Sequence, residues 1–234
     1  MAAIQVNDVV TRVGQLLQDT THIRWPLDEK LQYITDACRE VCFYKPDACV
    51  QTSVATLVSG TKQTIPAAGT TLLDIVRNMG VGGATPGIAP RIVTREILDA
   101  QQSDWHASTP DSVVRHYVFD QQNQKVFYVF PPQPATSQGS LEMVYSAEPA
   151  EAVSGGTLEL DGTWLPAVVN YTLYRCYSKD AEYAANANLA QLYYQAFTGQ
   201  LVGRTNAETA SDVNRNSVGT NPNVRASSIQ QSRN

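Results

Sequence analysis

The clearest helical pattern in the chain is PLDEKLQYITDACREV, residues 26–41. Pro26 suits the first position of a helix, and Asp28 and Glu29 lie in the first turn, where the helix dipole favours anions. Pro46 ends the pattern. The apolar residues recur every three or four positions, which places them on one helical face: Leu27, Leu31, Ile34, Cys38 and Val41. We therefore predict a helix here, as part of a helical bundle.

Three further helices of this bundle are predicted, one before this stretch and two near the C-terminus. Residues 7–18 have helical spacing, with Asn7 as the N-cap. Pro166 opens a helix that runs through Cys176. A last helix has apolar residues at 4-3-4-3-4 spacing, which is typical of a seam against another helix: Tyr183, Ala187, Ala190, Tyr194, Phe197 and Leu201. Residues 1–48 and 160–202 are thus predicted to form the helical bundle.

The middle of the chain is richer in β-branched residues. Residues 50–58 predict a strand, and 62–65 predict its return strand after a turn at Ser59-Gly60. Residues 72–79 follow two threonines and end at Gly80, so we predict a short capped helix there. A loop is expected at residues 81–90.

The best hairpin signal lies further along the chain. Residues 113–119 and 125–130 are strand-like, and Pro131-Pro132 is expected to end the second strand. We also predict a short strand at 91–94 and a helical turn or two at 96–105. A third strand is expected at 141–147, and residues 154–156 are expected to form a boundary. The predicted fold class is α+β, with an antiparallel β-rich insertion at 49–159 between N- and C-terminal helices.

The last segment, residues 203–234, changes composition. Its sizeable apolar residues are sparse, and Asn, Ser, Thr, Gln and Arg fill most of the remainder without periodicity. Such a segment does not bury enough apolar surface to fold alone. We predict an extended C-terminal docking arm, held by a partner chain through backbone hydrogen bonds and a few apolar anchors.

Composition excludes some classes of function. Charged residues make up 17%, below the about 25% of a typical soluble domain, as expected for a surface that partners cover. A net charge of −5 disfavours a nucleic-acid grip, although an acidic protein can line a passage along which DNA slides. The N-terminus MAAIQ has no basic and apolar signal-peptide pattern, and no run is long enough to span a membrane.

The four cysteines are expected to be reduced and buried in a cytosolic environment. Cys38 and Cys42 share a helical face, but Cys49 and Cys176 do not complete the usual spacing of a zinc site. The glycines at 80–83 lack the ending of a phosphate loop. We predict no metal and no cofactor.

No catalytic motif surrounds His22, His106 or His116, so we predict that the protein is not an enzyme. A catalytic site would need one of these histidines to meet a carboxylate or a thiol. Six of the 11 tyrosines crowd the last two helices on more than one face, which suggests either a tyrosine-rich core or surfaces that a partner covers.

Several short segments resemble the head-to-tail adaptor (connector) proteins of short-tailed, T7-like bacteriophages, also called tail tubular protein A. The most specific is KDAEY at 179–183, followed by an Ala/Asn-rich helix that ends in YQAF at 194–197. The other segments are WPL at 25–27, APR at 89–91, VFYVFPP at 126–132, LPAVVNY at 165–171 and YRCYSKD at 174–180.

This resemblance implies a structural virion protein of the tail or neck, assembled in the host cytoplasm. Twelve copies would form a ring that joins the portal protein to the tail nozzle protein and forms part of the DNA passage for ejection, with no sequence-specific DNA binding and no membrane. The arm would dock on the portal through charged and apolar residues: Arg204, Arg215, Val224, Arg225, Ile229 and Arg233. The alternatives are a stopper or tail-completion protein and a virion-associated hydrolase.

Overall fold

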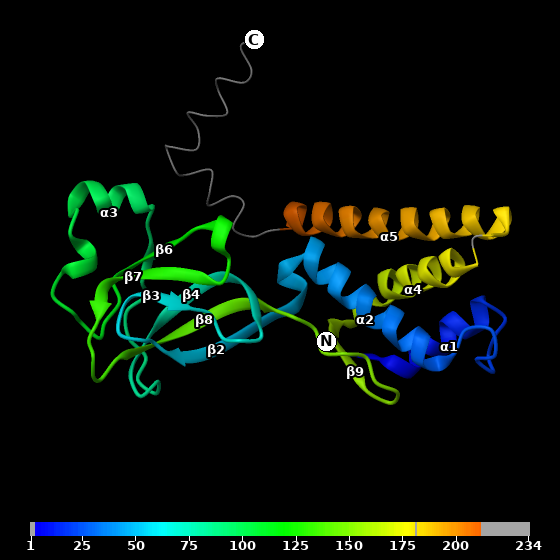
Figure 1. Ribbon diagram of the computed structural model, residues 1–234, viewed down its shortest axis with the longest axis horizontal. Helices are drawn as coiled ribbons and strands as arrows, with labels where there is room; N and C mark the ends of the chain where they lie inside the picture. The colour runs from blue at the N-terminus through cyan, green and yellow to red at the C-terminus, as the bar shows by residue number, and fades with distance from the viewer. Residues whose placement is uncertain (1–2, 181, 212–234) are drawn as a thin grey trace, which may run out of the picture.

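The structure, a computed structural model, describes residues 3–180 and 182–211 (Figure 1). It contains both helices and antiparallel sheets, so the predicted α+β class is confirmed. The helices are α1 Val6–Leu16, α2 Leu27–Tyr44, α3 Arg95–Gln101, α4 Leu165–Lys179 and α5 Ala184–Ser211. The strands are β1 Ala3–Gln5, β2 Val50–Thr56, β3 Gly60–Thr64, β4 Gly69–Val81, β5 Arg91–Ile92, β6 His116–Phe119, β7 Val126–Gln133, β8 Gly139–Ala147 and β9 Thr157–Asp161.

Helices from both ends of the chain share one hydrophobic core. Helix α4 packs against α1, α2 and α5, and the four helices lie together at one end of the molecule (Figure 1). Ile34 on α2 and Leu173 on α4 are completely buried in this core. Strand β1 pairs antiparallel with β9, a ribbon that the sequence did not predict, and it joins the N-terminus to the end of the β-rich region. The bundle arrangement and the domain limits stay predictions.

Aromatic rings fill the seam between α4 and α5. Tyr177 stacks on Tyr193 with ring centroids 5.6 Å apart, and Tyr174 lies 4.9 Å from Tyr194. Phe197 is completely buried, with its ring centroid 5.1 Å from that of Tyr171. Most of the crowded tyrosines therefore belong to the tyrosine-rich core, because the spacing of α5 presents them to α4.

Two sheets form the other end of the molecule. One has the strand order β2-β8-β4 and the second has the order β3-β7-β6-β5. They enclose a second core that includes the fully buried Phe127 of β7 and Leu141 and Met143 of β8. Strands β6 and β7 form the predicted antiparallel hairpin, whereas β5 and β6 are parallel, so the insertion is not antiparallel throughout.

The region of residues 69–81 corrects the predicted short helix. These residues form the long strand β4, which pairs with β8 through several register shifts. Two of these shifts add Leu73 and Val76 as extra residues between paired positions. Each such β-bulge displaces the alternation by one residue. Leu72, Ile75 and Met79 are consequently all buried at a spacing that imitates a helix.

Strand pairing and strand ends also differ from the prediction. Strands β2 and β3 both exist, but β2 pairs with β8 and β3 with β7, so they are not a hairpin. The aromatic and apolar partners supplied by distant strands outweigh the local turn signal. Strand β7 continues through Pro131-Pro132 to Gln133, and the Phe130–Pro131 peptide is cis.

Two local features of the helical end were also predicted wrongly. The N-cap position of α1 is Gln5, and Asn7 lies inside the helix, where its Oδ1 accepts the N–H of Gly155 at 3.0 Å. Cys42 is joined to Cys49 in a disulfide, because the short turn after α2 brings the two residues together.

Cys38 and Cys176 remain free thiols and are buried, as predicted. Burial raises the pKa of both thiols to about 12, so they are unreactive at neutral pH. These two cysteines fill the core as small apolar side chains.

The start of the predicted arm is also corrected. Residues 203–211 continue α5 to Ser211 and are not extended. Arg204 and Glu208 on successive turns form an ion pair with a 2.8 Å separation between Nε and Oε1, which supports the helix beyond its apolar seam. The rest of the predicted arm, residues 212–234, lies outside the described residues.

We expect Phe197→Ala to lower the free energy of unfolding by about 3–5 kcal/mol, because it leaves a cavity in the seam between α4 and α5. Urea unfolding monitored by circular dichroism measures this change. The matched control is Leu192→Ala on the same helix, where the side chain is 57% exposed, and we expect a change below about 0.5 kcal/mol. Equal effects of the two substitutions would contradict the packing described for this seam.

Candidate protein-interaction surfaces

The loop between α1 and α2 is held by a buried ion pair. Lys30 is completely buried, and its Nζ lies 3.2 Å from Oδ2 of Asp19, which is 6% exposed. The Lys30 ammonium also donates to the Asp19 carbonyl at 3.2 Å and to Nδ1 of His22 at 3.0 Å. All three donors of the ammonium group therefore have acceptors, which is the condition for a lysine to be buried while charged.

The Asp19 carboxylate also fixes the backbone of the loop. It accepts the N–H groups of Ile23 at 2.9 Å and Trp25 at 3.0 Å. Burial alone would raise the pKa of Asp19, but these hydrogen bonds and Lys30 outweigh it and lower that pKa to about 2. The indole N–H of Trp25 donates to the carbonyl of Cys176 at 3.1 Å, which ties the loop to α4.

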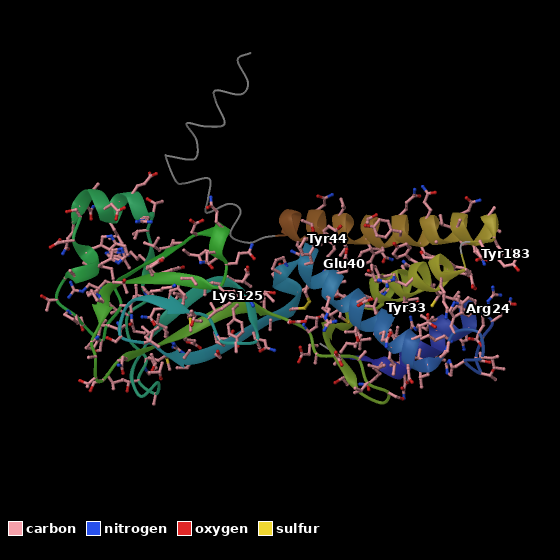
Figure 2. The ribbon with its side chains drawn as sticks, in the orientation of Figure 1. Arg24, Tyr33, Glu40, Tyr44, Lys125 and Tyr183 are labelled. Carbon is pink, nitrogen blue, oxygen red and sulfur yellow. A yellow bond between two sulfur atoms is a disulfide. The ribbon has the colours of Figure 1, made fainter. Side chains whose placement is uncertain are left out.

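This fixed loop presents an apolar side chain to solvent. Ile23 is 83% exposed, more than any other large hydrophobic residue among those described. Next to it, Arg24 forms an ion pair of 2.7 Å with Asp180 while its side chain remains 55% exposed. Figure 2 shows Arg24 and Tyr183 at the same end of the molecule. The loop is thus a rigid, partly apolar projection beside a cation.

A cleft lies at the opposite end of α2, between that helix and the β-rich region. Its volume is ≈ 900 Å³, enough for several side chains. Phe43 is 77% exposed and Leu73 is 38% exposed, and both line the cleft. The Arg39–Glu148 ion pair spans the cleft with 3.2 Å between Nε and Oε1. Glu40 also lines it and makes no ion pair with any cation in the described part of the chain.

Arg204 is the one predicted partner-binding residue that lies within the described part of the chain. Its guanidinium lies 4.1 Å from the centroid of the Trp164 ring and contacts the Thr163 hydroxyl. It also pairs with Glu208, whose Oε2 is 2.5 Å from Nζ of Lys45 at the end of α2. Hydrogen bonds from Lys45 and Arg204 lower the pKa of Glu208. Arg204 thus holds α5 to its own chain, and its role toward a partner stays a prediction.

The other predicted arm residues lie outside the described residues: Arg215, Val224, Arg225, Ile229 and Arg233. Within its described part, the structure exposes two large apolar side chains that the sequence pattern did not predict as contact residues, Ile23 and Phe43. Ile23 lies in a segment without periodicity, and Phe43 lies one position beyond Cys42 on α2, off the predicted apolar stripe. The one signal in the sequence was, in each case, a large apolar residue that lies outside any predicted apolar stripe.

The three histidines are separated from one another. His22 contacts Lys30, His106 stacks on Trp105 with centroids 3.6 Å apart, and His116 stacks on Phe130. Nδ1 of His106 also lies 2.8 Å from the Thr61 hydroxyl. Among residues 3–180 and 182–211, no histidine pairs with a carboxylate or thiol, and no cluster of potential metal ligands is found.

A model of the SU10 adaptor protein family matches residues 4–225, which include the four packed helices and the β-rich region. The chain belongs to the SU10 adaptor protein family. A comparison with curated proteins finds no match. In the described ranges, this adaptor has no helix with both the length and the hydropathy of a membrane span.

Membership of this family indicates the general role of the protein. Members of the SU10 adaptor family are structural phage proteins, not enzymes, so this adaptor interacts with other virion proteins and belongs in the virion. The match extends 14 residues beyond Ser211, the last residue that the structure describes, and includes Arg215, Val224 and Arg225. Ile229 and Arg233 lie beyond it. The surfaces of this adaptor that matter are therefore those that bind protein partners.

Asp19→Asn tests the buried ion pair. At neutral pH we expect it to lower the free energy of unfolding by about 3–5 kcal/mol, because Lys30 would remain buried without its carboxylate. The folded-state pKa of Asp19 lies below its ordinary value, so its contribution is present above about pH 4 and is lost as the pH falls through about 2.

Urea unfolding at pH 7 and at steps down to pH 2 measures this dependence. The difference between the wild type and Asp19→Asn is expected to shrink as the pH falls. Asp104→Asn is the control, because this exposed carboxylate has no such partners, and its effect should stay below about 0.5 kcal/mol. A pH-independent difference between Asp19→Asn and the wild type would contradict the assignment.

Proposed function

We propose that this protein is a ring-forming head-to-tail adaptor of a short-tailed, T7-like phage. Twelve copies join the portal protein to the tail nozzle protein and form part of the DNA passage. The observation that carries the proposal is the match to the SU10 adaptor protein family over residues 4–225. The segment resemblances at 25–27, 126–132 and 174–183 support the finer assignment to a T7-like adaptor.

Exposed apolar side chains and net charge support such a ring. Helical segments 1–48 and 160–202 face the portal and neighbouring copies, and the β-rich region 49–159 faces the nozzle. Apolar side chains remain exposed at the helical end and at the cleft, and such side chains mark surfaces that partners cover. A net charge of −5 lets DNA pass through the lumen without strong binding to phosphates.

The C-terminal arm is the proposed portal contact. Its charged candidates are Arg215, Arg225 and Arg233, and its apolar anchors are Val224 and Ile229. Arg204 lies at the base of the arm on α5, where its contacts with Trp164 and Glu208 keep that helix in place. In this proposal the arm consists of residues 212–234, because residues 203–211 belong to α5.

A chain that ends at Ser211 tests the arm. It keeps every described contact, including those of Arg204 and Glu208, so we expect unfolding like that of the full chain. We expect its affinity for purified portal, measured by co-sedimentation, to fall at least about tenfold, because sparse anchors carry most of the binding energy in such an interface. Unchanged affinity would contradict the role of the arm.

The ring itself is measured on the full chain. Native mass spectrometry and electron microscopy of the purified protein, alone and with portal, are expected to show a closed ring of twelve copies. Binding to the nozzle but not to the portal would favour a stopper or tail-completion protein. A monomer under both conditions would contradict the ring.

A further inference from the structure

Two exposed apolar features lie at opposite ends of α2 and cannot meet within one chain. Ile23 precedes the helix, and the cleft with Phe43 lies beside its last turns. The 18 residues of α2 place these two features about 27 Å apart. In Figure 2, Arg24 marks the first end, and Glu40 and Tyr44 mark the second. Within residues 3–180 and 182–211, a single copy therefore leaves both features exposed.

The projecting loop is preorganised for binding. Asp19 fixes the N–H groups on both sides of Arg24, and Gln18 and His22 adopt positive φ values of 55° and 56°. Left-handed backbone of this kind is unfavourable for residues other than glycine, so the buried contacts with Lys30 must maintain it. A loop that is already ordered loses little conformational entropy when a partner covers its tip.

We propose that the cleft of each copy receives the loop of residues 17–26 from a second copy of this chain. Ile23 enters between Phe43 and Leu73. The proposal rests on the ring of the proposed function and describes how neighbouring copies in that ring contact one another. The contact joins two different surfaces, so every copy offers one loop and one cleft. A heterologous contact of this kind repeats around an axis and closes a ring when the rotation allows.

Charge supports the same pairing. Arg24 lies next to Ile23 and keeps its side chain 55% exposed, although it binds Asp180. Its guanidinium has five N–H donors, so some remain for a further acceptor. Glu40 at the cleft makes no ion pair with any cation of the described residues, and Arg39 and Glu148 neutralise one another. When Ile23 enters the cleft, Arg24 is expected to pair with Glu40.

Mixing two complementary variants of the full chain tests the contact. Ile23→Asp disables the loop and leaves the cleft intact, while Phe43→Asp disables the cleft and leaves the loop intact. Both side chains are largely exposed, so both variants are expected to unfold like the wild type. Each variant alone should weaken self-association at least about tenfold, because a carboxylate would enter an apolar contact.

An equimolar mixture should form heterodimers and no larger species. In each pair, one intact loop binds one intact cleft, and the remaining loop and the remaining cleft are both disabled. Analytical ultracentrifugation and native mass spectrometry distinguish the species. Ile92→Asp, at an exposed residue of β5, is the control and should assemble like the wild type. If the wild type and both variants all form rings, the proposed contact is wrong, but the proposed ring is supported. A mixture that remains monomeric also overturns the contact, and a wild type that never associates overturns the ring as well.

Charge exchange provides a second test. Arg24→Glu and Glu40→Arg should each weaken self-association several-fold, and the double variant should restore it, because each contact then regains an opposite pair. The control combines Arg24→Glu with Glu96→Arg on α3, an exposed carboxylate away from the cleft, which should restore nothing. Equal behaviour of the two double variants would overturn the pairing.

Discussion

The burial of α4 between helices from both ends of the chain is the constraint on which the other features depend. Leu173 and Cys176 are fully buried, and the equally buried hydroxyl of Thr172 donates to the carbonyl of Val168 at 2.8 Å, so no polar group of that side chain is left unpaired. Helices α1, α2 and α5 each cover part of α4. Because the β-rich region is inserted between α2 and α4, this packing also fixes where the insertion leaves and rejoins the helices.

The same packing makes an adaptor possible. A rigid α2 holds the loop at one end and the cleft at the other, so two apolar surfaces are kept apart in one subunit. The buried Asp19–Lys30 pair costs desolvation but fixes the loop, whereas the exposed Arg24–Asp180 pair contributes about 1 kcal/mol or less. Stability in the core is thus combined with surfaces that remain open for virion partners.

The local pattern of apolar residues predicted the main helices well, but it predicted the pairing of the strands poorly. Periodicity located α2, α4 and α5 because each presents one apolar stripe to a single core. It failed for β4, where two bulges give buried residues a helical spacing, and for β2 and β3, whose partners lie far along the chain. From the sequence, the candidate interaction surfaces could be predicted only in general terms, as surfaces that partner proteins cover. The exposed positions of Ile23 and Phe43 follow from tertiary contacts that leave no periodic signal.

The sequence by itself determined the α+β class, the aromatic seam of α5 and membership of an adaptor family, since these depend on residue spacing and on the residues themselves. Only the tertiary structure decided that α5 continues to Ser211 and that Arg204 binds its own chain. It also decided which strands pair and where a cleft opens beside α2. The physical reason is that these outcomes depend on contacts between residues far apart in the chain, which no window of local sequence contains.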